Sequence, residues 1–218
     1  MYYSYVPSFR EQQPRVMTVT GTAAISVEPD IVMIELEVVT QNESLTMAQQ
    51  ENAQKINQVM QALLQFGIPR ENIQTATYNI YPRYDYVDGK QVFRGYEVTH
   101  ALTVKMDEGG QVGKIIDAAV QNGVNRVSAI EFTVADKQHY YQQALSAALR
   151  DATAKAQTIA ETMELNLDAK PLKIVEEMNE SPATHKAFAT MEENTSTTIE
   201  PGQIKIMANV RTKFQFFA

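Results

Sequence analysis

The stretch Ile-Val-Met-Ile-Glu-Leu-Glu-Val-Val-Thr at residues 31–40 decides the fold class, because apolar and polar side chains alternate along it. Ile34 and Leu36 fall on one face of such a strand, whereas Glu35 and Glu37 fall on the other. Successive side chains of a strand point to opposite faces, so this pattern predicts a sheet with one buried face.

The residues after this strand change to helical spacing. Ser44 can cap a helix, apolar side chains then recur every three or four positions, and Gly67 followed by Pro69 ends the run. The same reasoning along the chain predicts six further strands and two further helices. The strands are expected at 16–27, 73–81, 92–106, 127–134, 171–178 and 203–217, and the helices at 108–122 and 136–163.

Two sections repeat one order of elements. The strand at 31–40, its helix and the strand at 73–81 match the strand at 97–106, its helix and the strand at 127–134. This β-α-β-β-α-β order is that of a ferredoxin-like sheet. We therefore predict an α+β fold, with a mixed or antiparallel sheet of about seven strands, three helices and an internal ferredoxin-like arrangement.

The domain organisation follows from composition. Residues 1–15 are rich in Tyr, Gln and Pro and lack periodicity, so we interpret them as a tail. Residues 16–217 form one domain, within which the polar stretch at 179–201 is expected to be a mobile loop.

The composition excludes several classes of function. The 218 residues include no cysteine, which removes disulfides, thiolate metal sites and cysteine nucleophiles. The net charge of −7 and the scattered Lys and Arg argue against a nucleic-acid partner. No apolar run approaches the length that spans a membrane. The first ten residues lack the features of a secretion signal, so the expected location is the cytoplasm.

Residues 78–96 contain the most distinctive surface motif. Asp88-Gly89 predicts a tight hairpin turn, because both residues tolerate positive φ. A two-residue turn places Tyr84 opposite Phe93 and Tyr81 opposite Tyr96. It also sets Arg83 against Arg94, a like-charge pair that favours a bulge or a longer loop. 

Aromatic side chains crowd both arms of this hairpin and are predicted to point to both of its faces. Tyrosine is enriched at protein interfaces, so a subunit contact is the favoured interpretation, with sugar or nucleotide stacking as the alternative. The candidate interface residues are Tyr78, Tyr81, Tyr84, Tyr86, Phe93 and Tyr96.

No catalytic, cofactor-binding or metal-binding constellation is found in the sequence. His100 stands alone on an apolar strand face, where a hydrogen-bonded, partly buried histidine is expected rather than a metal ligand. No His and carboxylate spacing typical of a metal site occurs, and no Gly-x-Ser-x-Gly or P-loop motif is present.

Several short motifs together are more specific than any one of them. They are Val19-Thr20-Gly21, Glu28-Pro29-Asp30, Gly67-Ile68-Pro69, Ile73-Gln74-Thr75, Gly95-Tyr96, Gly113-Lys114-Ile115-Ile116-Asp117-Ala118-Ala119, Asn125-Arg126-Val127, Asp151-Ala152, Lys155-Ala156 and Glu200-Pro201-Gly202. In this order and spacing they resemble the SIMPL-domain family, which includes periplasmic immunogenic and oxidative-stress-defence proteins of bacteria. The resemblance covers about residues 16–217. It implies large homo-oligomers and, for some members, a link to stress tolerance.

The sequence thus favours a non-enzymatic, self-assembling protein whose partner is a further copy of itself, with no cofactor and an unknown ligand. A module that binds a peptide or small molecule through the aromatic hairpin is the first alternative. A cryptic enzyme is the second. The resemblance also implies a secretion signal in many members, which this sequence lacks.

Overall fold

A computed structural model describes residues 15–107, 111–177, 185–186 and 197–217. The chain divides into two compact units. The central unit comprises Ser26–Asp136 and Pro182–Ile204, and the terminal unit comprises Met1–Ile25, Lys137–Ser181 and Lys205–Ala218. Each unit has its own sheet and its own hydrophobic core.

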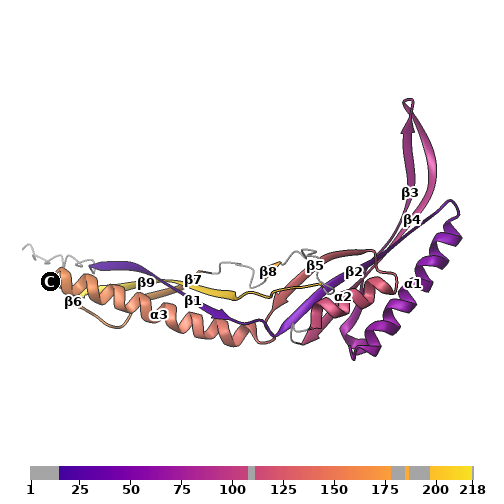
Figure 1. The fold of residues 1–218 in the computed structure, drawn as a ribbon. Coiled ribbons are helices and arrows are strands. Elements are labelled where there is room, and N and C mark those ends of the chain that lie inside the picture. The colour runs from indigo at the N-terminus through magenta and orange to yellow at the C-terminus, as the bar shows by residue number, and fades with distance from the viewer. Residues whose placement is uncertain (1–14, 108–110, 178–184, 187–196, 218) are drawn as a thin grey trace, which may run out of the picture. The chain divides into compact units, whose positions relative to one another are not determined.

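The central unit is built on a five-stranded sheet with strand order β3-β4-β2-β5-β8 (Figure 1). Its elements are β2 (Ile31–Asn42), α1 (Leu45–Gln65), the 3-10 turn η1 (Arg70–Asn72), β3 (Ile73–Val87), β4 (Lys90–Asp107), α2 (Val112–Gln121), β5 (Arg126–Thr133) and β8 (His185–Lys186). Every one of these strand pairings is antiparallel.

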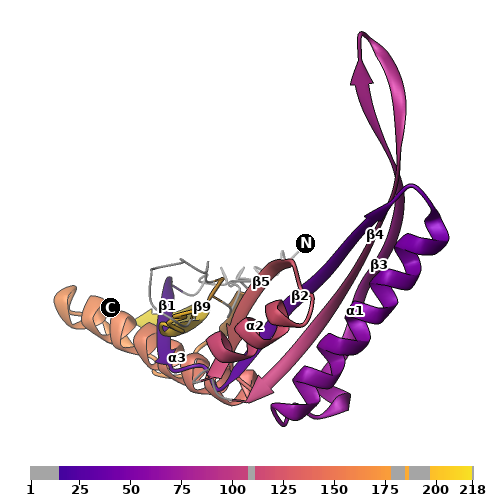
Figure 2. The ribbon, with the colours of Figure 1, turned by 45° about the vertical axis from the view of Figure 1, so that its right-hand side comes forward.

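The hydrophobic core of the central unit lies between the sheet and the two helices α1 and α2, which pack on one face of it. The alternation in β2 buries Ile34 and Leu36 completely, and the same face meets Val59 of α1 and Ile116 of α2. Figure 2 shows both helices on one side of this sheet. The opposite face of the sheet therefore carries the other set of alternating side chains, among them Glu35.

A buried amide fixes α1 on the sheet. Asn52 is 1% exposed, and its Nδ2 donates to the backbone oxygens of Val38 at 2.9 Å and Val98 at 3.2 Å. These two carbonyls belong to neighbouring strands, so one side chain joins the helix to both. Ser44 occupies the N-cap position of α1 as expected, but its side chain makes no capping hydrogen bond. Its backbone N–H instead donates to Oδ1 of Asn42.

The terminal unit pairs the two ends of the described chain. Its elements are β1 (Val16–Val27), α3 (Lys137–Thr162), β6 (Asn166–Leu167), β7 (Lys173–Glu177) and β9 (Ile204–Phe217). β9 lies between β1 on one side and β6 and β7 on the other. Helix α3 runs along this sheet (Figure 1) and buries a row of five alanines, Ala144, Ala148, Ala152, Ala156 and Ala160.

Small residues let α3 approach β1 closely. A Cβ atom at Gly21 would collide with the backbone oxygen of Ala148 and with Ala152. Two charged side chains of α3 also bind the backbone of β1. Thr22 N–H donates to Asp151 at 2.8 Å, and Lys155 Nζ donates to the oxygen of Thr20 at 3.0 Å. The helix thus satisfies backbone groups that an edge strand would otherwise expose.

The predicted α+β class and its three helices, two of them long, are confirmed. The strands are divided between two sheets rather than joined in one, because β1 and β9 pair with each other and not with β2. The ferredoxin-like arrangement stays a prediction.

Two predicted segments fall largely outside the described residues. These are the tail at 1–15 and the loop at 179–201. Within the loop, Thr197 is held on α2, where its N–H and hydroxyl donate to Asp117 at 3.2 and 2.6 Å.

Candidate functional site

The hairpin of β3 and β4 projects beyond the rest of the central sheet (Figure 2). Strand β2 ends at Asn42, which lies opposite Tyr96, so residues 83–95 form a two-stranded arm without a third strand. At its tip, Asp88 and Gly89 have φ values of 52° and 74°. Both are positive, as the sequence predicted for a tight two-residue turn.

A bulge interrupts the pairing at the base of this arm. Arg83 lies opposite Gly95, but Tyr84 lies opposite Phe93, so Arg94 is the extra residue. Gly95 has a φ of +114°, and a Cβ atom there would lie 2.5 Å from the backbone oxygen of Asn42. Glycine is therefore required both by the backbone conformation and by the close approach to β2.

Because of the bulge, part of the strand register differs from the register that the sequence predicted. Tyr84 faces Phe93, as expected. Tyr81, however, faces Glu97 rather than Tyr96, which instead lies opposite Pro82. The predicted conflict between Arg83 and Arg94 is resolved by the bulge, which removes them from direct opposition.

Five of the six predicted aromatic residues gather on one face. The Tyr84 and Phe93 ring centroids are 5.6 Å apart, and those of Phe93 and Tyr96 are 5.3 Å apart, both edge to face. Tyr86 and Tyr78 share this face by alternation along β3. We call these residues the aromatic stripe: Tyr78, Tyr84, Tyr86, Phe93 and Tyr96. Aromatic side chains therefore lie on both faces, as expected, but unequally, because Tyr81 is the one of the six that lies on the opposite face.

The stripe is exposed along the arm. Tyr86 is 76% exposed and Phe93 is 46% exposed. Tyr81 is 57% exposed on the opposite face. At its base the stripe meets the helix, where Gln49 Nε2 of α1 donates to the Tyr78 hydroxyl at 3.4 Å.

Charged side chains brace the face opposite the stripe. Arg94 Nε lies 2.8 Å from Asp85 Oδ2 across the two strands. Arg83 donates to the side chain of Gln41 and lies 3.9 Å from Glu97. These contacts tie the arm to the last residues of β2, so that the stripe is held on a defined base.

His100 lies at the foot of the stripe and is partnered. Its Nε2 is 3.1 Å from Thr75 Oγ1, and its ring stands edge to face against Tyr78 at 5.2 Å. Burial lowers the pKa of His100, because desolvation disfavours the imidazolium form. The histidine is therefore a neutral packing residue near pH 7, as the sequence suggested.

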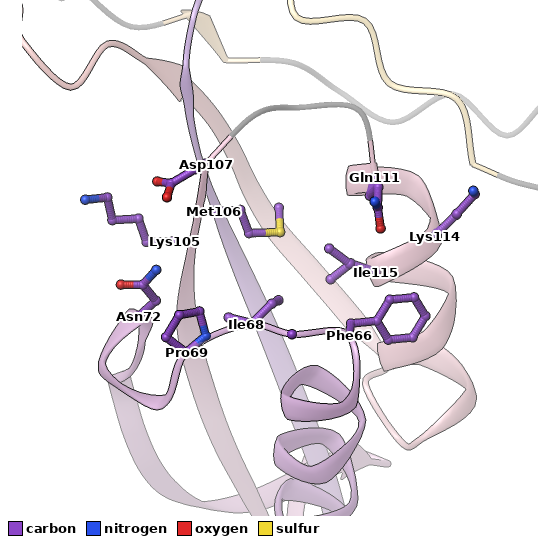
Figure 3. Close-up of a pocket in the computed structure, with 11 residues that line it drawn as sticks. Phe66, Ile68, Pro69, Asn72, Lys105, Met106, Asp107, Gln111, Lys114 and Ile115 are labelled. Atoms are coloured by element: carbon purple, nitrogen blue, oxygen red, sulfur yellow. The ribbon is translucent and has the colours of Figure 1, made fainter.

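A separate pocket lies in the central unit between the end of α1, the end of β4 and the start of α2 (Figure 3). Its volume is about 630 Å³. Ile68, Met106 and Ile115 form an apolar floor, with Lys105 and Lys114 at opposite sides. This pocket could not be predicted from the sequence, because its walls come from three segments whose proximity depends on the fold.

No group of three or more His, Asp or Glu side chains among the described residues could hold a metal ion. The helices of the described chain also include none that is long and apolar enough to cross a membrane.

These features define an α+β protein of two units that presents a one-sided aromatic arm. A family model matches residues 17–214, and its description is SIMPL, a protein of unknown function (DUF541). The chain belongs to the SIMPL family, as the sequence motifs indicated.

Curated relatives agree with this assignment. The 26 kDa periplasmic immunogenic protein of Brucella melitensis is 30% identical over 172 residues, which cover 74% of this chain and 69% of that protein. The uncharacterized protein YggE of Escherichia coli K12 is 27% identical over 147 residues, which cover 67% of this chain and 59% of that protein.

The expected cytoplasmic location is wrong on this comparison, because the Brucella relative is named a periplasmic protein. The expectation was based on the first residues of the sequence alone, and these residues do not decide the compartment in which the protein works.

One solved structure, a hydrolase from Listeria innocua, aligns over 89% of this chain and 92% of that chain. Its TM-score is 0.18 at 8% sequence identity, so the likeness carries no argument about fold or activity.

Proposed function

We propose that this SIMPL protein is non-enzymatic, that it assembles with further copies of itself through the aromatic stripe, and that it does so in the periplasm. The observation that supports self-assembly is the position of the aromatic stripe, on one face of an arm of only two strands. The periplasmic location follows the name of the Brucella relative.

An isolated two-stranded hairpin is marginally stable in water, so an exposed arm gains from a partner on its apolar face. Each aromatic side chain can bury roughly 150–250 Å² in such a contact. Tyr and Phe lose few rotamers on binding, which is why they dominate interface energetics. Tyr86, the most exposed member of the stripe, would gain the most burial.

The two faces of the arm supply a matched experiment. Tyr86→Ser removes a ring from the stripe, whereas Tyr81→Ser removes an equally large, exposed ring from the opposite face. The mass in solution should fall for Tyr86→Ser and stay at the wild-type value for Tyr81→Ser, as measured by light scattering after size exclusion. If the two variants had the same mass in solution, the aromatic stripe would not be the contact surface.

Binding of a small molecule is the second candidate function, favoured by the pocket beside Lys105 and Lys114. A volume of about 630 Å³ with an apolar floor suits a ligand with an apolar body and a negative group. A thermal-shift screen of aromatic and acyl carboxylates on wild type and K105Q/K114Q tests it. Stabilisation that does not depend on the two lysines would reject it.

The link to stress tolerance that the resemblance implies stays a prediction. The same holds for an enzymatic role.

A further inference from the structure

The terminal sheet has one face under α3 and a second face whose side chains point away from the helix. Alternation along β9 buries Val210 and Phe214 against α3, and it directs Arg211 and Lys213 to the second face. The antiparallel register of β7 and β9 places side chains of β7 beside them. We call this second face the open face, and it includes Lys173, Val175, Lys205, Met207, Arg211 and Lys213.

The open face is basic although the chain as a whole is acidic. Lys173 lies directly opposite Lys213, and neither of them nor Lys205 has an ion-pair partner among the described residues. Arg211 lies 2.6 Å from Glu177, which is the one carboxylate that β7 and β9 place on this face. Like charges directly opposite on a sheet are destabilising, so an anion near Lys173 and Lys213 would stabilise the pair.

The cations are spread along the face rather than gathered at one point. Lys205 and Lys213 both lie on β9, and at the rise of an extended strand their backbones are about 27 Å apart. A single small anion contacts only one end of such a row. A layer of anionic headgroups presents charges over its whole length, so the spacing favours an extended anionic surface as the partner.

Apolar side chains are exposed among these cations. Val175 is 38% exposed and lies opposite Arg211, and Met207 is 42% exposed and shares its strand face with Lys205. Basic side chains around exposed apolar ones are typical of proteins that bind where lipid headgroups meet acyl chains. A nucleic acid also offers a row of phosphates, but it has no apolar layer beside them, so a lipid surface is favoured by both features.

Hydroxyl groups extend the face onto β1. Thr18, Thr20 and Thr22 are exposed, and they alternate with Val19, which packs in the core with α3. A hydroxyl can donate to a phosphate oxygen. The side chains of β1 on this face are therefore compatible with the same partner.

We propose that the open face of the terminal sheet binds the surface of a membrane that contains anionic lipids. Lys173, Lys205 and Lys213 bind headgroup phosphates, and Val175 and Met207 reach the start of the acyl layer. The contact requires neither self-assembly nor the aromatic stripe, because every group that it uses belongs to the terminal sheet. Since the cations lie near solvent, added salt should weaken the binding.

Vesicle flotation with the full chain tests the proposal. Wild type should bind vesicles of phosphatidylglycerol and phosphatidylcholine in equal parts, and it should not bind vesicles of phosphatidylcholine alone. K173E/K213E should bind the anionic vesicles at least about tenfold more weakly than wild type, because two attractive charges become repulsive. K173R/K213R keeps both charges and should bind as wild type does.

A matched control separates the open face from the net charge of the chain. Q138E/Q142E/R150E lowers the net charge by the same amount as K173E/K213E, but at exposed positions of α3, which covers the other face of the sheet. It should bind anionic vesicles as wild type does. Circular dichroism checks that each variant is folded.

Several results would overturn the proposal. They are equal binding of wild type to neutral and anionic vesicles, equal weakening by Q138E/Q142E/R150E, and no binding of wild type to anionic vesicles. If, in the last case, K173E/K213E also lowers the mass in sedimentation velocity, the open face is a contact between copies instead. Tyr86→Ser should still bind anionic vesicles, so a failure of the proposed self-assembly and a failure of lipid binding can be told apart.

Discussion

Phe93 and Tyr96 stand edge to face on the same side of β4, with 5.3 Å between their ring centroids. Residues three apart on a regular strand point to opposite faces. The bulge at Arg94, completed by the positive φ of Gly95, rotates the chain so that both rings join the stripe. One glycine therefore decides whether the arm has a single aromatic face.

Gly95→Ala should disrupt this arrangement. The new Cβ would meet Asn42 and Glu43, and an L residue at a φ of +114° is strained, so we expect a loss of more than about 2 kcal/mol in unfolding free energy. Gly67→Ala is the control, since Gly67 has a φ of +83° but open space around it, and it should cost about 1–2 kcal/mol. Urea denaturation measures both. Equal losses would show that the approach to β2 is unimportant.

Asn52→Ala should weaken the attachment of α1 to the central sheet. It leaves two buried carbonyls without their donor, which costs about 2–3 kcal/mol of unfolding free energy. Asn52→Asp should cost more at pH 7, because a buried carboxylate would face those carbonyl oxygens. Asn57→Ala on the exposed side of α1 provides the control, and a comparable loss there would assign the effect to helix propensity instead.

Asp151→Ala should expose the edge of β1. The N–H of Thr22 loses its acceptor, so its hydrogen exchange should quicken relative to wild type. Glu161→Ala, elsewhere on α3, should leave that exchange unchanged. Unaltered exchange at Thr22 in Asp151→Ala would mean that the helix does not protect this edge.

The contribution of Asp151 should depend on pH in a defined direction. The hydrogen bond from Lys155, followed by that from the Thr22 N–H, holds the pKa of Asp151 below its usual 3.8. A depressed carboxyl pKa stabilises the fold above the unfolded value, and this stabilisation is lost as pH falls through the folded value. The difference in unfolding free energy between wild type and Asp151→Ala should thus be constant from pH 5 to 7 and shrink below about pH 4. A difference that grows on acidification would contradict this assignment.

The sequence predicted those features of the fold that are local. Alternation located β2 and β9, and Asp88-Gly89 predicted the turn, because each depends on neighbouring residues alone. The conflict between Arg83 and Arg94 even indicated the bulge. Its position, and hence the register of Tyr81, depends on the approach of Gly95 to β2.

Features that depend on distant partners could not be read in the same way. Strand patterns do not state which strands pair, so the division into two sheets was missed. β6 and β8 span two residues each, too few to show a period. The opposition of Lys173 and Lys213 was missed because the two residues become neighbours only when β7 pairs with β9.

The most direct test of the central claim is the mass of the wild-type chain in solution, measured by sedimentation velocity over a range of concentrations. Self-assembly predicts a weight-average mass above the 24.5 kDa of one chain that rises with concentration. A single species of 24.5 kDa at every concentration would contradict it.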